Sequence, residues 1–136
     1  MTRILDTNVC VWLIRQRPAH VVGRLREASP EGVAISAITL AELEFGAARS
    51  AEPQRAWAAL EHFAAPFEVL PFGASATRAY GRLRAYLQQR GTPIGPMDLL
   101  IAAQAVSLGM TLVTNNLPEF SRVPGLHTED WTVQAH

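Results

Sequence analysis

Short apolar segments alternate with longer segments of helical spacing along this chain, and that alternation limits the fold more than any other feature. Strands that are separated by helices usually pair in parallel, with the helices packed on both faces of the sheet. The pattern therefore predicts an α/β fold with a short central parallel sheet. The expected strands are Ile4–Leu5, Val33–Ser36, Phe67–Leu70, Thr111–Thr114 and a weaker segment within Leu126–Val133. The expected helices are Val9–Arg15, Ala19–Ala28, Leu40–Ser50, Pro53–Ala64, Ser75–Arg90 and Leu99–Leu108.

The composition suits a single domain over residues 1–136, because 49% of the 136 residues are apolar and can form a sizeable core. The formal net charge is zero, so a polyanion would have to be held by a local patch or by a metal ion. Cys10 is the only cysteine, which excludes an internal disulfide and a thiolate metal cluster. The N-terminus does not resemble a signal peptide, and no apolar run approaches the roughly 20 residues of a membrane span. We therefore expect a cytoplasmic protein with no membrane partner.

Four polar residues stand at the ends of apolar runs: Asp6, Glu42, Asp98 and Asn116. In parallel sheets, ligands bind beyond the carboxyl ends of the strands, where the strand order reverses. Asp6 ends the first expected strand and Asn116 follows the fourth, while Glu42 and Asp98 fall in the first turns of expected helices. If all four converge, the site would repel itself without a cation. Hard oxygen ligands favour Mg²⁺ or Mn²⁺ over zinc.

Each of these residues also has a purely structural explanation that the local sequence leaves open. Asp6 could cap the helix that follows it, and Asp98 could stabilise a helix N-terminus through the dipole. Thr39-Leu40-Ala41-Glu42 fits a capping box, in which Glu42 would accept from the backbone N–H of Thr39. Asn116 could be a turn residue in the left-handed conformation. The occurrence of all four at matching positions favours a joint site over separate caps.

Absent motifs exclude several classes of function, and one stretch of the chain is rich in arginine. There is no glycine-rich phosphate loop and no histidine or cysteine metal motif, and the histidines are scattered. A phosphoacceptor receiver domain would need a lysine, and all twelve basic residues are arginine. The stretch from Val69 to Met97 has no acidic residue but contains four arginines. These arginines are Arg78, Arg82, Arg84 and Arg90. They could form a solvated helix face, contact phosphates of RNA, or contact an acidic segment of a partner protein.

Four stretches of the chain resemble the motifs of PIN-domain ribonucleases, and their order and spacing resemble the VapC family of type II toxin–antitoxin systems. The closing stretches Val123–Leu126 and Glu129–Trp131 are similar to that family too, so the resemblance covers nearly the whole chain. The four stretches are Leu5-Asp6-Thr7-Asn8, Ser36 to Gly46, Asp98 to Ala103, and Thr114 to Phe120.

This resemblance implies a PIN-like three-layer α/β/α sandwich and Mg²⁺-dependent cleavage of RNA, tRNA included, with Mn²⁺ able to substitute. It also implies a homodimer and a small antitoxin protein that blocks the active site and joins a larger assembly. Asp6, Glu42 and Asp98 fall on the acids of the family. Asn116 falls where many relatives have a fourth acid, and Glu119, one turn further on, could supply the missing charge.

We therefore expect a metal-dependent endoribonuclease in which Asp6 and Asp98 bind the ion directly. Glu42 would bind it directly or through water, and Asn116 would orient the attacking water. Three more residues could hydrogen-bond the metal ligands from outside: Thr7, Ser36 and Thr114. Two alternatives stay open, a non-catalytic module that binds antitoxin or RNA, and a DNA nuclease of the same fold.

Overall fold

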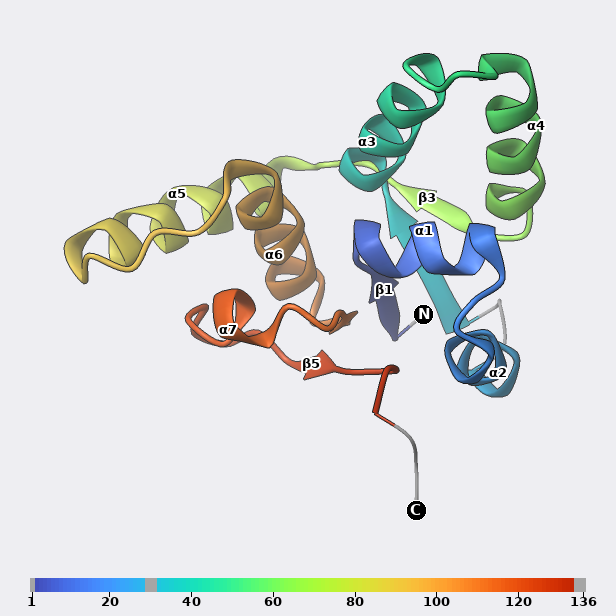
Figure 1. Cartoon of the computed structure of the whole chain (residues 1–136). Helices are drawn as coiled ribbons and strands as arrows, with labels where there is room; N and C mark the ends of the chain where they lie inside the picture. Colours follow the sequence, from blue (N-terminus) through green and yellow to red (C-terminus); the bar gives the residue numbers. More distant parts are fainter. Residues whose placement is uncertain (1, 29–31, 134–136) are drawn as a thin grey trace.

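The protein is described from a computed structural model, which covers residues 2–28 and 32–133. These residues form a five-stranded sheet in the order β3-β2-β1-β4-β5, and every pair of neighbouring strands is parallel (Figure 1). The strands are β1 (Arg3–Leu5), β2 (Val33–Ser36), β3 (Glu68–Leu70), β4 (Thr111–Val113) and β5 (Thr128–Glu129).

The strand order reverses beside β1, which lies between β2 and β4. Ile4 is paired with Ala34 on one side and with Leu112 on the other. The chain adds β2 and β3 outward on one side of β1, and later adds β4 and β5 on the other side. Ligands of such sheets bind at this reversal, beyond the carboxyl ends of the two strands that flank it. The residues that directly follow β1 and β4 are Asp6 and Thr114.

Helices cover both faces of the sheet, so the expected three-layer sandwich is confirmed. In Figure 1, α5 and α6 lie on one side of the sheet, and the α3–α4 pair lies on the other side. The helices are α1 (Thr7–Arg15), α2 (Ala19–Ala28), α3 (Ala37–Ala48), α4 (Pro53–Ala64), α5 (Ala74–Gln89), α6 (Pro96–Leu108) and the short α7 (Leu117–Phe120).

Successive strand residues point to opposite faces and divide the core into two halves. Ile4 and Leu112 pack with residues of α5 and α6, whereas Leu5 and Val113 pack with residues of α1 and α2. All four of these strand residues are fully buried. β1, β2 and β4 are almost completely buried on both faces, which explains why they read as apolar runs, whereas the edge strands β3 and β5 have exposed residues.

The expected boundaries hold for most elements, and the clearest differences are at the starts of three helices. α6 begins at Pro96, not at Leu99, because proline is favoured in the first turn of a helix. α1 begins at Thr7 because the Asp6 carboxylate accepts from the Thr7 N–H. α3 begins at Ala37, not at Leu40, because the Ser36 hydroxyl accepts from the Ile38 N–H at 2.9 Å. The fifth strand is only two residues long, and α7 was not expected.

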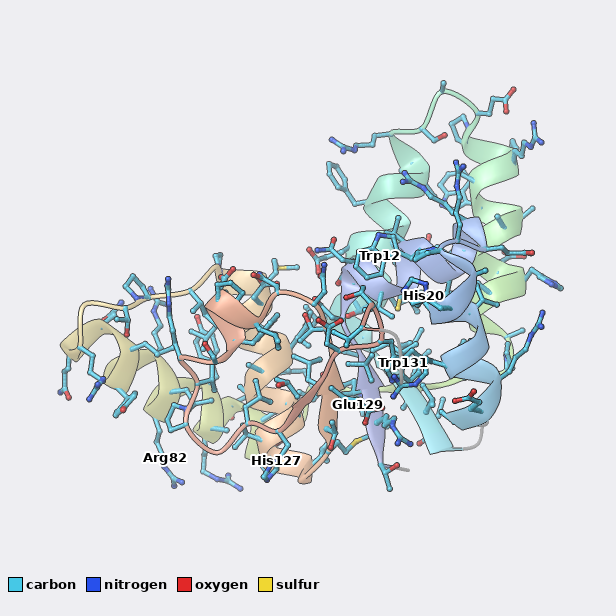
Figure 2. The ribbon with its side chains drawn as sticks, turned by 60° about the horizontal axis from the view of Figure 1, so that its bottom comes forward. Trp12, His20, Arg82, His127, Glu129 and Trp131 are labelled. Carbon is cyan, nitrogen blue, oxygen red and sulfur yellow. The ribbon has the colours of Figure 1, made fainter. Side chains whose placement is uncertain are left out.

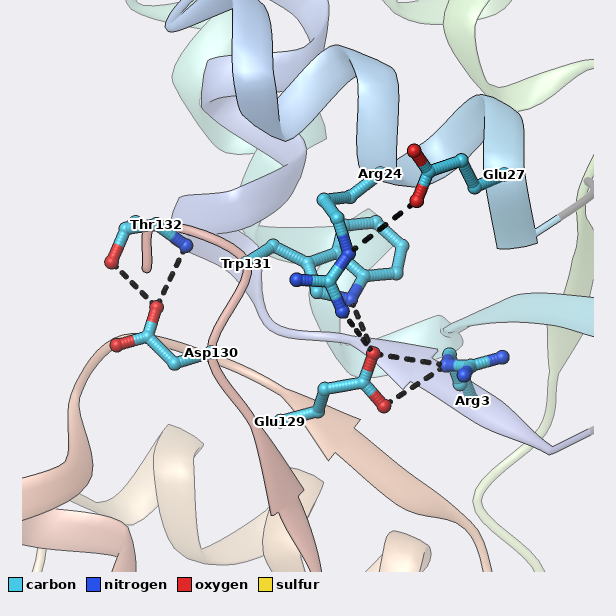
Figure 3. A network of polar contacts seen from close by, with 7 residues as sticks. All are labelled: Arg3, Arg24, Glu27, Glu129, Asp130, Trp131 and Thr132. Atoms are coloured by element: carbon cyan, nitrogen blue, oxygen red, sulfur yellow. Dashed lines mark hydrogen bonds and ion pairs between the residues drawn. The ribbon is translucent and has the colours of Figure 1, made fainter. Parts of the chain in front are cut away.

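The C-terminal segment is fastened to the sheet through Glu129 (Figure 3). Its carboxylate accepts from Trp131 Nε1 at 2.7 Å, from Arg24 Nη2 at 2.9 Å and from Arg3 Nε at 3.2 Å. Trp131 is buried in the same half of the core as Leu5. Three parts of the chain that are far apart in sequence therefore meet on one carboxylate.

No helix in the described part of the chain is long and apolar enough to cross a membrane.

Candidate active site

Asp6 is buried at the carboxyl end of β1 and is held from both sides. One carboxylate oxygen accepts from the Thr7 N–H at 2.8 Å, and the other accepts from the Thr114 hydroxyl at 2.8 Å. The backbone N–H of Asp6 donates to the carbonyl of Val113 at 2.9 Å, which continues the pairing of β1 with β4. The capping role is therefore real, yet it uses only part of the acceptor capacity of the carboxylate.

Glu42 approaches this group from α3, in a different position from the expected one. Because α3 begins at Ala37, Glu42 lies in its second turn, and the capping box with Thr39 is wrong. The Glu42 carboxylate instead accepts from the Thr7 hydroxyl at 2.7 Å. Thr39, which was expected to cap α3, is instead buried inside the helix, and its hydroxyl oxygen lies 3.3 Å from the Thr7 hydroxyl. Thr7 thus connects Glu42 to the turn that contains Asp6.

Asp98 lies in the first turn of α6, as expected, and faces Glu119. The contact between the two carboxyl groups raises the pKa of Asp98 and lowers the pKa of Glu119. Gly95 lies against both of them, since a Cβ atom at this position would be 3.4 Å from Glu119 Oε1 and 3.7 Å from Asp98 Oδ2. The Gly95 N–H donates to Glu119 Oε1, so the loop before α6 positions this pair.

Asn116 does not adopt the left-handed conformation, because its φ is −84°. Its backbone N–H donates to the Thr114 hydroxyl, the group that itself donates to Asp6. The side-chain amide of Asn116 donates to Glu119 Oε2 at 2.8 Å. Asn116 therefore orients Glu119, and the carboxylate that reaches Asp98 from this segment belongs to Glu119.

Burial and the negative charges of neighbouring carboxylates raise the pKa values of Asp6 and Asp98. Burial raises the pKa of Asp98 to about 7, and the negative charges of Asp6, Glu119 and Glu42 add to the rise. Burial also raises the pKa of Asp6, against hydrogen bonds from Thr114 and Thr7 that lower it. The pKa of Glu119 is lowered by the Gly95 N–H first of all. Among the described residues, none of these four carboxylates lies within ion-pair distance of an arginine or a histidine.

The donor chemistry of the site fits a hard divalent cation. All the converging groups are oxygen donors, the type that Mg²⁺ and Mn²⁺ prefer. Within residues 2–28 and 32–133, no three acid, histidine or cysteine side chains are already gathered tightly enough to bind one ion together. The carboxylates instead accept hydrogen bonds from neutral donors: Glu42 from Thr7, Asp6 from Thr114, and Glu119 from Gly95. The site is thus an acidic group of oxygen donors rather than a closed ligand cage.

Of the three residues expected to support the acids, two contact them directly. Thr114 donates to Asp6, and Thr7 donates to Glu42. Ser36 is fully buried, and its hydroxyl oxygen accepts from the Ile38 N–H at the start of α3. This bond fixes where α3 begins, and a supporting role of Ser36 toward the acids stays a prediction.

The expected basic strip on α5 does not behave as one surface. Arg82 extends outward from α5, away from Glu129 and Trp131 (Figure 2), and Arg78 is likewise exposed. Arg84 donates to the hydroxyl of Tyr80 at 3.0 Å. Arg84 lines a hollow with Pro93 and Ile94 of the loop that leads to α6, and Arg90 lines a separate hollow with Thr92 and Arg122. Arg122 was missed, because a single arginine after a short helix gives no periodic signal.

A parallel sheet with a group of carboxylates where the strand order reverses is typical of a metal-dependent α/β enzyme. Comparisons with known proteins show which family the chain belongs to. Residues 3–126 match the PIN domain family. The tRNA(fMet)-specific endonuclease VapC of Salmonella typhimurium is 44% identical over 128 residues, which cover 94% of this chain and 96% of the relative. Ribonuclease VapC2 of Rickettsia felis is 42% identical over 132 residues, or 96% of this chain and 98% of the relative.

Solved structures agree with these sequence relatives. The crystal structure of DNA-bound VapBC from Salmonella typhimurium has a TM-score of 0.92 and 43% identity, and the match covers 96% of this chain and 98% of that chain. The VapBC2 structure from Rickettsia felis, bound to a DNA fragment, has a TM-score of 0.90 and 40% identity and covers 96% and 99% of the two chains. The chain therefore belongs to the PIN-domain family and, within it, to the VapC ribonuclease toxins. PIN-domain ribonucleases generally use a divalent metal ion.

Proposed function

We propose that this protein is the toxin of a type II toxin–antitoxin pair and that it cuts RNA by Mg²⁺-dependent hydrolysis of phosphodiester bonds. The observation that carries the proposal is the meeting of Asp6, Glu42, Asp98 and Glu119 at the reversal of the sheet, with no basic side chain of the described residues paired to them. Such a group is unfavourable for structure alone, because like charges at a buried site repel.

The residues divide the work at this site. Asp6 and Asp98 would hold the ion directly, and Glu42 would hold it directly or through water. When bound, a divalent ion lowers the pKa of a water and offsets negative charge on the phosphate oxygens. Thr114 and Thr7 fix the orientation of Asp6 and Glu42. Asn116, by donating to Glu119, keeps a fourth carboxylate beside Asp98, which replaces the acid that many relatives carry at the Asn116 position.

The proposed substrate is structured RNA of the tRNA class. A relative that is 44% identical over 94% of this chain is described as specific for tRNA(fMet). The acid centre itself does not distinguish RNA from DNA, because the donors face a phosphate and not a sugar. Cleavage assays should therefore include single-stranded DNA beside tRNA and single-stranded RNA.

Neutralising either the buried Asp6 or the half-buried Asp98 should abolish cleavage. Asp6→Asn and Asp98→Asn each remove a charge that would hold the ion, so we expect at least a 100-fold loss of RNA cleavage in Mg²⁺, on the order of the effect of removing a metal-site group. Asp130→Asn is the matched control, because Asp130 caps the backbone of Thr132 and lies outside the acid group. Full activity of Asp98→Asn, with metal-free reactions silent, would refute the assignment.

The proposed protein partner is a small antitoxin that covers the acid centre. Solved relatives are described as VapBC toxin–antitoxin structures, which supports a partner of this type. A groove of about 390 Å³ between α1, α3 and α4 starts at Thr7 and Glu42 and is lined further out by Val11, Ile14 and Leu43. An apolar antitoxin segment in this groove would end beside the acids. Homodimerisation and a cytoplasmic location remain part of the proposal.

A bulky residue in this groove should separate antitoxin binding from catalysis. Gly46 lines the groove, and a Cβ atom there meets nothing within 4 Å, so Gly46→Arg fills the groove without strain in α3. We expect at least a 10-fold weaker complex in isothermal titration with the cognate antitoxin, on the order of 1.4 kcal/mol, and unchanged RNA cleavage. Gly81→Arg on α5, also free of contacts within 4 Å, is the control. Equal affinity of both variants would place the antitoxin elsewhere.

A further inference from the structure

A hollow of about 300 Å³ lies on the outer side of the loop that precedes α6. Its lining contains two arginines, two hydroxyl side chains and one tyrosine, and no acidic residue. The lining residues are Tyr86, Arg90, Thr92, Ser121, Arg122 and Pro124. A hollow with two positive charges and extra donors is suited to an anion.

Both arginines of the hollow are positioned by a neutral group. The guanidinium carbon of Arg90 lies 5.3 Å from the ring centroid of Tyr86, in a cation–π contact. Arg122 Nη1 donates to the carbonyl of Pro93 at 3.0 Å. Neither arginine forms an ion pair with any residue of the described part of the chain. Each guanidinium therefore keeps several N–H donors free, since it has five in total.

The hollow is joined to the acid centre through the loop before α6 and the segment Glu119–Arg122. Arg122 follows Glu119 by less than one turn of chain, and its charge contributes to the lowered pKa of Glu119. Glu119 accepts from the Gly95 N–H, and Arg122 donates to Pro93, so two bonds tie the same loop to the same segment. Glu119 of this segment belongs to the acid centre, and Arg122 of the same segment belongs to the hollow. A strand of nucleic acid whose scissile phosphate lies at the acids would pass this hollow.

We propose that the hollow binds a backbone phosphate of the RNA strand, next to the phosphate that is cut. Arg90 and Arg122 donate to its oxygens, and the hydroxyls of Thr92 and Ser121 are further donors. Tyr86 acts through Arg90, as the platform on which the guanidinium rests. This inference rests on the proposed ribonuclease function and adds where the substrate strand runs. Arg78 and Arg82, on the exposed part of α5, are not needed for it.

The test measures binding of uncut RNA, so that it does not depend on catalysis. All variants carry Asp98→Asn, and binding of a fluorescent single-stranded RNA is followed by anisotropy over a series of salt concentrations. Arg122→Gln and Arg90→Gln should each weaken binding by about 5- to 10-fold and reduce the slope of log K against log salt by about 0.7, the value for one phosphate on a single strand. Arg55→Gln, on α4, is the matched control and should change neither quantity.

Tyrosine variants check the platform. Tyr86→Phe keeps the ring and should bind like the parent, whereas Tyr86→Leu should lose about 3-fold, as expected when a cation–π contact is removed at an exposed site. Equal losses in both variants would show that the ring does not position Arg90 and would overturn the role of Tyr86.

The outcomes separate this inference from the proposed function. If Arg122→Gln keeps the affinity and salt slope of Arg55→Gln, the phosphate site is wrong, although cleavage by the unmodified protein would still support the ribonuclease. If the unmodified protein cuts no RNA in Mg²⁺, the ribonuclease proposal fails, whatever the binding data show. If Arg122→Gln weakens only self-association or antitoxin binding, the hollow belongs to a protein interface, and the phosphate site is again wrong.

Discussion

The surroundings of Glu129 and those of Asp98 shift the pKa of a carboxylate in opposite directions. Around Glu129, two arginines and the Trp131 N–H converge on one carboxylate. Burial raises its pKa, but the bonds from Trp131 and Arg3 and the charges of Arg3 and Arg24 outweigh burial, so the pKa is lowered. Around Asp98, burial and three neighbouring carboxylates act together, and the pKa rises to about 7.

This difference indicates that the Glu129 group is structural and that the acid centre is suited to a ligand. The carboxylate of Glu129 is satisfied by groups within the chain and needs nothing from outside. The carboxylates of the acid centre are held by neutral donors such as Thr114 and Thr7, which orient them but leave their charge unbalanced. A backbone hydrogen bond connects the two regions, because the N–H of Thr114 donates to the carbonyl of Glu129 at 3.0 Å. The Glu129 group thus fixes the strand end from which Thr114 reaches Asp6.

The largest stability effect in this comparison should come from Glu129. Glu129→Gln removes the charge on which Arg3 and Arg24 converge, and we expect about 2 kcal/mol of destabilisation, typical of lost hydrogen bonds to a charged group. Urea unfolding followed by circular dichroism measures this loss. A loss below about 0.5 kcal/mol, the usual range of a surface change, would show that the Glu129 group does not fasten the C-terminal segment.

A smaller effect of opposite sign should appear at Asp98 when metal is absent. The folded-state pKa of about 7 lies above the ordinary 3.8, so the folded state binds this proton more tightly than the unfolded state. Stability from this group is therefore present at low pH and is lost as pH rises from about 4 to about 7. Asp98→Asn should match the parent near pH 4 and exceed it above pH 7, by on the order of 1 kcal/mol after solvent screening.

The Glu129 variant should show the reverse dependence on pH. The pKa of Glu129 is lowered below 4.5, so its contribution is present above that value and fades as pH falls through the folded pKa. Melting temperatures of both variants and of the unmodified protein, measured in chelator from about pH 2 to pH 8, check the pair of slopes. Parallel curves for Asp98→Asn and Glu129→Gln would show that the two regions do not differ in the way described here.

Much of the fold could be predicted from the sequence because both faces of the sheet are buried. The runs Val33–Ser36 and Thr111–Val113 stand out as short apolar segments between helices, and the strand ends then locate Asp6 and Thr114. The start of α3 was misplaced because Ser36 and Thr39 are both good N-caps. Only the packing of α3 against α1, where Thr7 meets Glu42 across 35 positions, decides between them.

The parts of the site that could not be predicted depend on contacts between distant segments. Glu119 was named from the sequence as a possible fourth charge, but the Gly95 N–H that positions it lies 24 positions earlier and carries no motif. The role of Asn116 follows from its bond to Glu119, and nothing in the sequence separates that bond from a turn. The hollow beside Arg122 could not be predicted, because it forms between Arg122 and residues of α5 and the loop before α6. Local patterns find the acids, and tertiary contacts decide which of them meet.

Addition of Mg²⁺ to the metal-free protein tests the central claim most directly, with the melting temperature as the readout at pH 8. The unmodified protein and Glu129→Gln should both gain stability as Mg²⁺ is raised through the millimolar range, by RT ln(1 + [L]/Kd), because each keeps the acid centre. Asp98→Asn should gain nothing beyond the general effect of salt. An equal rise for Asp98→Asn and the unmodified protein would mean that these carboxylates do not form a site for a divalent ion.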